Sequence, residues 1–135
     1  MTQFSFPRQE RLKSRKAIST LFEEGKSLYS YPIRILYSAG SNSPDPIYPV
    51  KCGFSVSKKN FRRAVDRNLL KRRMREAWRL NKYGLVAGAR EKGISLNVFV
   101  VYVGKETEAY EVVKKSVVKG IGEMMRMLLN GKKCA

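Results

Sequence analysis

The chain has 135 residues, enough for one compact domain with a modest hydrophobic core and too few for two independent domains. It carries 28 Lys and Arg residues against 11 Asp and Glu residues, a formal charge of +17, which predicts a polyanionic partner. It contains no histidine, and its two cysteines cannot complete a tetrahedral metal site by themselves. These features argue against catalysis by protein side chains and predict no metal site in the protein.

The composition also argues against a membrane-spanning or secreted protein. The longest apolar run, residues 98–103, is strand-sized and far short of the roughly 18 to 20 residues that a spanning helix needs. The N-terminal residues lack the charged and then apolar layout of a secretory signal, and the only cysteines are Cys52 and Cys134. We therefore expect a cytoplasmic chain with reduced thiols and no membrane partner.

The N-terminal part of the sequence predicts an arm followed by a short helix. Residues 1–12 show no periodicity and are interpreted as an extended basic arm outside the core, for which disorder is the default expectation. Ser14 can cap an amphipathic helix that Gly25 is placed to end. The apolar residues of this helix recur at helical spacing and are Ala17, Ile18, Leu21 and Phe22.

Two strands are predicted next. Residues 33–37 and 48–57 are rich in β-branched and aromatic residues and flank a turn-rich connection, which indicates two antiparallel strands. A further short strand is expected near residues 27–30.

The second half of the sequence predicts a helix, a strand and a final helix. Residues 64–82 lack Gly and Pro and are rich in helix formers. Three glycines then break the chain before residues 96–103, whose continuous apolar run favours a central strand buried on both faces; they are Gly84, Gly88 and Gly93. Thr107 can cap a last amphipathic helix, and residues 131–135 form a tail. The order helix, strands, helix, strand, helix predicts an α+β fold with a mixed sheet packed by helices.

The helix predicted at 64–82 separates charge from apolar residues. At about 100° per residue from Val65, a cationic face forms between about 240° and 340° from Asn68, Lys71, Arg72, Arg75, Arg79 and Lys82. The core-facing stripe, Val65, Leu69, Leu70, Ala77 and Leu80, falls between about 0° and 140°, and Arg67 lies at the seam near 200°.

A solvated charged face is the usual explanation for a run of charge on a helix, but it fits this helix poorly. Solvated helices usually mix Glu with Lys to gain i,i+4 pairs, whereas like charges are neighbours on this face. Arginine dominates the face, and its planar fork can bind phosphate oxygens and stack on bases. Asn68 is either a surface amide or a ligand for a base or a ribose hydroxyl.

The stretch from Phe54 to Glu76, FSVSKKNFRRAVDRNLLKRRMRE, resembles the signature of bacterial ribonuclease P proteins. The pattern is two lysines, a short spacer, Ala-Val-x-Arg-Asn, two residues, Lys-Arg, two residues and Arg, which is far more specific than a generic Arg-rich helix. The resemblance covers about residues 10–130. Departures include Ile18, which stands where an aromatic residue is common in the family, and the segment 102–105 after the last strand.

This resemblance implies a single α/β sandwich domain over residues 13–130, with a left-handed βαβ crossover through the basic helix where the general rule would predict a right-handed one. It also implies that catalysis belongs to a partner RNA and its Mg²⁺ ions, which remove the 5′ leader from precursor tRNA. The protein would bind RNA and be non-catalytic alone.

The resemblance assigns two groups of site residues. The residues that the motif matches to the side facing the catalytic RNA are Arg67, Asn68, Lys71, Arg72 and Arg75, and the same patch begins at Lys58 and Lys59. We expect Arg62, Arg63 and Arg79 to belong to this RNA-binding group as well. Phe22, Tyr37 and Val56 would line a leader-binding cleft between the first helix and the sheet, where unpaired bases can stack on aromatic rings. Ordinary core packing is the competing interpretation for Phe22, Tyr37 and Val56.

Three other functions are alternatives to this one. A ribosomal or RNA-chaperone-like protein would share the size and charge but need not carry the Arg-Asn-x-x-Lys-Arg-x-x-Arg spacing. A carboxylate-metal nuclease would need two of Asp45, Asp66 and Glu76 to converge with a metal ion, but the last two lie roughly 15 Å apart along one helix. A membrane-binding helix would need the apolar stripe that the core requires.

Overall fold

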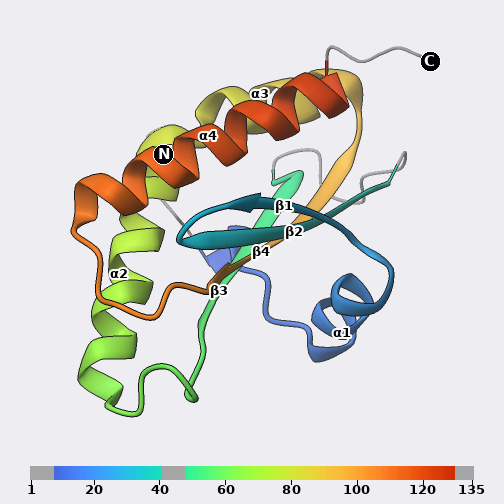
Figure 1. Cartoon of the computed structure of the whole chain (residues 1–135). Helices are drawn as coiled ribbons and strands as arrows, with labels where there is room; N and C mark the ends of the chain where they lie inside the picture. The colour runs from blue at the N-terminus through green and yellow to red at the C-terminus, as the bar shows by residue number, and fades with distance from the viewer. Residues whose placement is uncertain (1–7, 41–47, 130–135) are drawn as a thin grey trace.

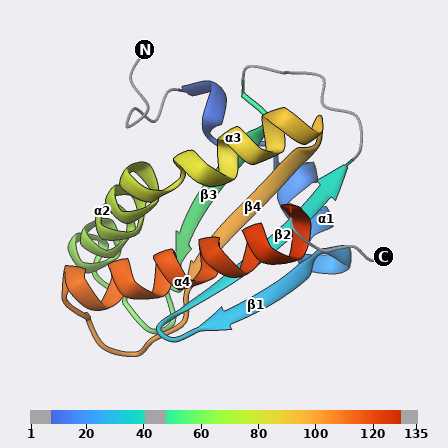
Figure 2. The ribbon, with the colours of Figure 1, turned by 90° about the horizontal axis from the view of Figure 1, so that it is seen from above.

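The structure is a computed structural model that describes residues 8–40 and 48–129. Its elements are a 3-10 helix η1 (Arg8–Glu10), α1 (Arg15–Glu24), β1 (Lys26–Ser30), β2 (Ile33–Gly40), β3 (Val50–Val56), α2 (Ala64–Asn81), α3 (Tyr83–Lys92), β4 (Ser95–Tyr102) and α4 (Tyr110–Leu129). α2, α3 and α4 cover one face of the sheet and α1 lies against the other (Figures 1 and 2). The predicted α+β fold with a mixed sheet is confirmed.

The four strands lie in the order β1-β2-β4-β3. β2 pairs antiparallel with β1 and β4, and β3 pairs parallel with β4. The strands predicted at 33–37 and 48–57 both form, but they are not neighbours, because β4 lies between them. The apolar run of β4 suits this position, since helices cover both faces of the sheet where β4 lies. β3 and β4 are joined through α2 and α3, and the left hand of this crossover stays a prediction.

Two apolar clusters form on the two faces of the sheet. The larger lies under α2, α3 and α4 and includes the fully buried Trp78, Met74 and Tyr102. The smaller, under α1, consists of Leu12, Leu21, Leu36 and Phe99. β4 supplies both clusters because successive side chains of a strand point to opposite faces.

The glycines after α2 do not break the chain as predicted, since α3 continues through Gly84 and Gly88. Leu85, Val86 and Ala89 are buried in the main core, and their burial outweighs the helix propensity of about 1 kcal/mol lost at each glycine. Gly93 ends the helix with φ 67°, a conformation that suits glycine.

The predicted N-terminal arm is corrected for residues 8–12, which pack against the domain. Arg11 forms a bridge with Cys52 on β3, and the Leu12 amide donates to the Cys52 carbonyl oxygen over 3.0 Å. Glu10 is buried and forms an ion pair with Lys82, the residue between α2 and α3. Residues 1–7 of the arm and the tail at 131–135 lie outside the described residues.

Candidate RNA-binding surface

The loop between β3 and α2, residues 57–63, is held by contacts that leave its cations outside. The Ser57 hydroxyl accepts from the amides of Lys59 and Asn60, over 3.1 and 3.4 Å, and the Phe61 amide donates to the Ser57 carbonyl over 3.1 Å. The Phe61 ring is buried edge-on against Tyr102, with centroids 5.7 Å apart. The loop therefore presents four exposed cationic side chains, Lys58, Lys59, Arg62 and Arg63.

Arg67 braces this loop from the first turns of α2. Its Nη1 donates to the carbonyl oxygens of Phe61 and Arg62, both over 2.8 Å. Arg67 is consequently half-buried, although a guanidinium has five donors and keeps others available for RNA. The structure gives Arg67 a positioning contact that the sequence pattern does not reveal, and its contact with RNA stays a prediction.

The residues of α2 that follow Arg67 form the predicted polar and cationic face. Asn68, Arg72 and Arg75 are exposed and Lys71 is half-buried. The opposite side of the helix is buried through Leu70, Met74, Ala77 and Trp78. Two residues assigned to the apolar stripe are corrected: Val65 is 66% exposed and Leu80 37% exposed, because Val65 lies in the first turn and Leu80 near the last turn of the helix.

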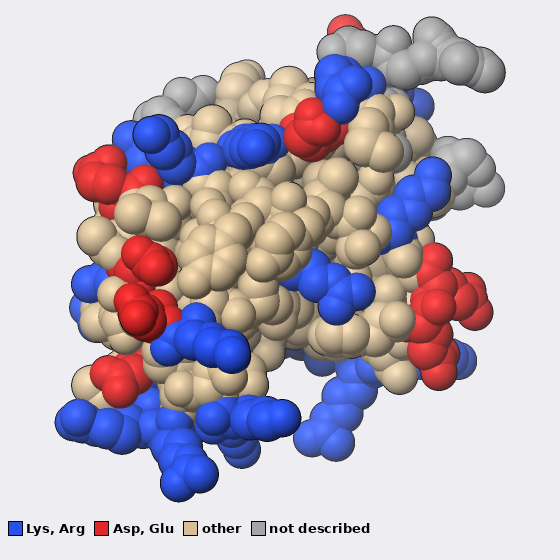
Figure 3. All heavy atoms as spheres, in the orientation of Figure 1, with Lys and Arg blue, Asp and Glu red and all other residues tan. Residues whose placement is uncertain are grey.

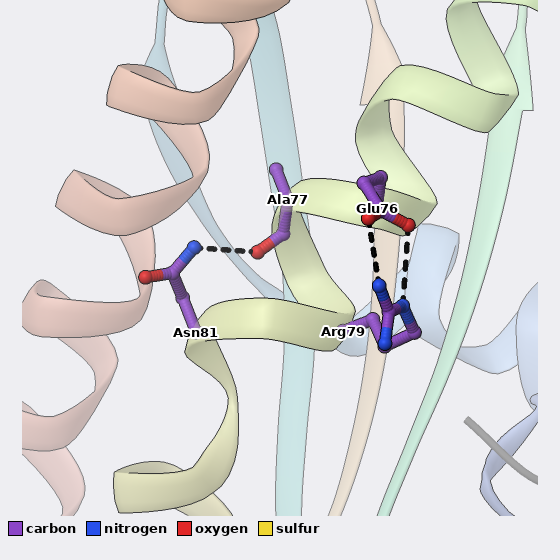
Figure 4. Close-up of polar contacts among 4 residues, drawn as sticks. All are labelled: Glu76, Ala77, Arg79 and Asn81. Atoms are coloured by element: carbon purple, nitrogen blue, oxygen red, sulfur yellow. Dashed lines mark hydrogen bonds and ion pairs between the residues drawn. The ribbon is translucent and has the colours of Figure 1, made fainter. Parts of the chain in front are cut away.

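Besides Arg67, two further arginines of α2 bind groups of the same chain. The Glu76 carboxylate accepts from Nε and Nη2 of Arg79 over 3.1 and 2.7 Å (Figure 4). The hydrogen bond from Arg79 lowers the pKa of Glu76, and the same bond raises the pKa of Arg79. Arg73, which the sequence pattern does not single out, donates to the carbonyl oxygen of Glu108 in the loop before α4. Arg79 thus joins the predicted surface with its charge largely compensated.

Lys82, at the end of the basic segment, is buried rather than exposed. Burial lowers its pKa to about 8, so the side chain is still charged at neutral pH, and the Glu10 carboxylate offsets part of the cost of burying that charge. The structure therefore removes Lys82 from the cationic face predicted for this helix.

The remaining cations form one surface over the 57–63 loop and the start of α2. Figure 3 shows Lys and Arg side chains gathered at the lower left, below the first turns of this helix. Among residues 8–40 and 48–129, none of the members of this surface takes part in an ion pair; they are Lys58, Lys59, Arg62, Arg63, Lys71, Arg72 and Arg75. Such an array repels itself and is suited to binding a polyanion.

The structure does not bring the three predicted leader-cleft residues together. Phe22 on α1 is 53% exposed, and its ring meets Phe99 of β4 edge-on, with centroids 5.7 Å apart. Tyr37 and Val56 lie on the other face of the sheet, in the main core, so they cannot line a cleft with Phe22. Tyr37 is 1% exposed, its hydroxyl contacts the Met127 sulfur over 3.6 Å, and burial raises its pKa. Successive side chains of β2 point to opposite faces of the sheet, so Tyr37 faces the main core while its neighbour Leu36 faces α1.

Phe99 is the aromatic residue of this face that the sequence analysis missed. A Cβ on Gly53 of β3 would lie 2.7 Å from the Phe99 ring, so glycine is needed for the ring to lie over this strand. The signal was available in the sequence, because Phe99 alternates with Val98 and Val100, and those two belong to the main core.

Within residues 8–40 and 48–129, no three His, Cys, Asp or Glu residues come together as a metal site. Nor do the described helices include one with the length and apolar character to cross a membrane. The Cys52 thiol is buried, and burial raises its pKa well above the ordinary value.

Comparison with known proteins agrees with this geometry. Residues 6–125 match the family model described as Ribonuclease P. The ribonuclease P protein component of Porphyromonas gingivalis is 37% identical over 118 residues, covering 87% of this chain and 85% of that protein. That of Chlorobium phaeobacteroides is 34% identical over 121 residues, covering 84% and 83%.

Solved structures support the same fold. The ribonuclease P protein of Thermotoga maritima superimposes with a TM-score of 0.62 and 26% identity, covering 84% of this chain and 96% of that one. The ribonuclease P protein of Staphylococcus aureus gives a TM-score of 0.64 at 19% identity, covering 90% and 98%. The chain therefore belongs to the family of bacterial ribonuclease P protein components.

Proposed function

We propose that the chain binds the catalytic RNA of ribonuclease P through the 57–63 loop and the exposed side of α2. The observation that carries this proposal is the array of cations that the loop and helix hold on one side, none of which forms an ion pair within residues 8–40 and 48–129. Arginine and lysine at such a surface neutralise phosphates and release counterions, which supplies affinity for an RNA backbone. Asn68, exposed within this array, is suited to contact a base or a ribose hydroxyl.

In this proposal the chemistry belongs to the RNA and its Mg²⁺ ions, which cleave the 5′ leader from precursor tRNA. The protein is a ribonuclease P component that is not catalytic alone. Its contribution is the affinity and placement of the two RNAs, in the cytoplasm.

The leader is assigned to the face of the sheet that carries α1. Phe22 offers an exposed ring there, and Phe99 supports it from β4. Aromatic rings bind unpaired bases by stacking without reading their sequence, which suits leaders of differing sequence. Phe22 and Phe99 take the place of Tyr37 and Val56 in this assignment.

The RNA surface is tested by changing one lysine pair and comparing it with a matched pair elsewhere. Lys58→Ala with Lys59→Ala removes two exposed cations of the loop, whereas Lys114→Ala with Lys115→Ala removes two exposed cations of α4. We expect the loop variant to lower the slope of log affinity against log salt by about one per lost phosphate contact. The α4 variant should bind the catalytic RNA like the parent, and equal losses in both would contradict the assigned surface.

The leader assignment is tested separately with Phe22→Ala in the reconstituted holoenzyme. Losing one stacked base should weaken binding of precursor tRNA by about 1 to 3 kcal/mol and leave mature tRNA affinity unchanged. Tyr83→Ala serves as the control, because Tyr83 is 51% exposed on α3, across the sheet from α1. A folded Phe22→Ala protein that still prefers precursor over mature tRNA as strongly as the parent would remove Phe22 from the leader path.

A further inference from the structure

One row of side chains crosses the sheet on the α1 face at the margin of the cluster that α1 covers, against which its member Val101 packs. The strand register pairs Tyr29 of β1 with Arg34 of β2, Arg34 with Val101 of β4, and Val101 with Ser55 of β3. Residues paired in this way lie side by side on one face, with Cβ atoms about 4.5 to 5.5 Å apart across an antiparallel pair. The row therefore joins the two edges of the sheet.

Tyr29 is the most exposed large hydrophobic side chain among the described residues, at 67%. Its neighbour Leu28 packs against the main core under α4, so alternation turns Tyr29 to the opposite, α1 face. The ring buries little area on folding, so its face is accessible to a ligand.

Arg34 supplies a cation directly opposite this ring. Its side chain is exposed, and the structure shows no ion pair for it within residues 8–40 and 48–129. A tyrosine beside an arginine suits a nucleotide, since the ring stacks on the base while the guanidinium binds the phosphate or stacks as well.

The row also has a direction relative to the RNA surface. Ser55 lies two residues before Ser57, where the cationic loop begins, and Tyr29 lies on the far edge of the sheet. From Phe99, which supports Phe22, Tyr29 is two strand spacings away and one two-residue step along the strand, about 12 Å in all. A stacked strand spans this distance with at most about four nucleotides.

We propose that Tyr29 and Arg34 form a separate subsite for one unpaired nucleotide of the leader, farther from the cleavage site than the nucleotide at Phe22. The inference rests on the proposed leader path. It adds that the path extends to the β1 edge and that leader length decides whether Tyr29 contributes.

The test uses holoenzyme reconstituted with the catalytic RNA and precursor tRNAs whose leaders lengthen one nucleotide at a time. Tyr29→Thr removes the ring and keeps a β-branched residue that suits a strand. It should bind long-leader substrate about tenfold more weakly than the parent and short-leader substrate equally well. Tyr29→Phe, which keeps the ring, should bind like the parent, and Tyr83→Ala should leave binding unchanged at every leader length.

The loss at Tyr29 should first appear with leaders up to about four nucleotides longer than those that reveal the loss at Phe22. If Phe22→Ala gives a length-dependent loss and Tyr29→Thr gives none, this inference is wrong and the proposed leader path stands. If neither variant discriminates between leader lengths, both fail. A Tyr29→Thr loss that is equal for all leaders and for mature tRNA would also overturn the subsite.

Discussion

The loop before α2 and the first half of this helix hold most of their basic side chains toward solvent, with Arg67 as the exception. The second half of α2 and Lys82 after it bind most of theirs to groups of the same chain. Lys58, Lys59 and Arg72 are exposed. Arg79 pairs with Glu76, and Lys82 pairs with Glu10 inside the protein. A run of positive charge in a sequence thus divides into ligands for RNA and contacts that hold the fold, and the division follows burial rather than residue type.

The largest effect on stability is expected at the buried ion pair between Glu10 and Lys82. Glu10→Ala removes the carboxylate that faces the buried Lys82 ammonium, and breaking one side of a buried ion pair typically costs about 3 to 5 kcal/mol. Urea unfolding should show this loss in the free energy of unfolding. Glu91→Ala, at an exposed glutamate of α3, should change it by less than about 0.5 kcal/mol, and equal values for the two variants would contradict the buried pair.

Two adjacent arginines separate the two roles directly. Arg72→Ala should weaken affinity for the catalytic RNA by about 1 to 3 kcal/mol and leave stability unchanged, because Arg72 is exposed. Arg73→Ala should do the reverse, since it loses the hydrogen bond to the Glu108 carbonyl, worth about 1.5 kcal/mol of stability. The test measures RNA affinity and the free energy of unfolding of both variants at one fixed salt concentration. If the two variants lose affinity and stability to the same extent, Arg72 and Arg73 do not have separate roles.

Arg67 should both bind RNA and hold the 57–63 loop, and a substitution that keeps its charge should have a smaller effect on RNA affinity. Arg67→Lys preserves the charge but loses the planar fork that reaches two loop carbonyls. We expect RNA affinity to fall by about 1 kcal/mol with an unchanged salt slope, because the loop loosens while the number of cations stays the same. Parent-like affinity in this variant would show that the brace is irrelevant to binding.

The smallest effect is expected at Glu76. Glu76→Gln should tighten RNA binding slightly by releasing the charge of Arg79, and it should lower stability slightly at pH 7. Because pairing lowers the pKa of Glu76 in the folded state, its contribution is present above the ordinary glutamate pKa of about 4.3. Parent and variant should therefore converge in stability as the pH falls through the lowered value, and a difference that persists in acid would contradict this cause.

The elements with strong local patterns could be predicted from the sequence. The first helix was correctly bounded by Ser14, whose hydroxyl accepts from the Ala17 amide, and by Gly25. The central position of β4 followed from its apolar run. α3 could not be predicted, because its glycines are opposed only by tertiary burial of residues such as Leu85.

The site was predictable in its residue types more than in its contacts. The motif identified the cations of the loop and of α2, but pairing through Glu76, Glu10 or backbone carbonyls depends on elements that meet only after folding. The prediction of the leader face placed Tyr37 on the wrong side of the sheet, because successive strand residues face opposite sides. Tyr37 lies in the main core, and Phe99, which the prediction did not include, lies on the α1 face.

The central claim is that the catalytic RNA covers the 57–63 loop and the first half of α2. Lysine acetylation of the unmodified protein, read by mass spectrometry with and without the catalytic RNA, tests this claim most directly. We predict protection of Lys58, Lys59 and Lys71 in the complex, with Lys114, Lys115 and Lys119 on α4 reacting as in the free protein. Protection of the α4 lysines while Lys58 and Lys59 stay reactive would contradict the account.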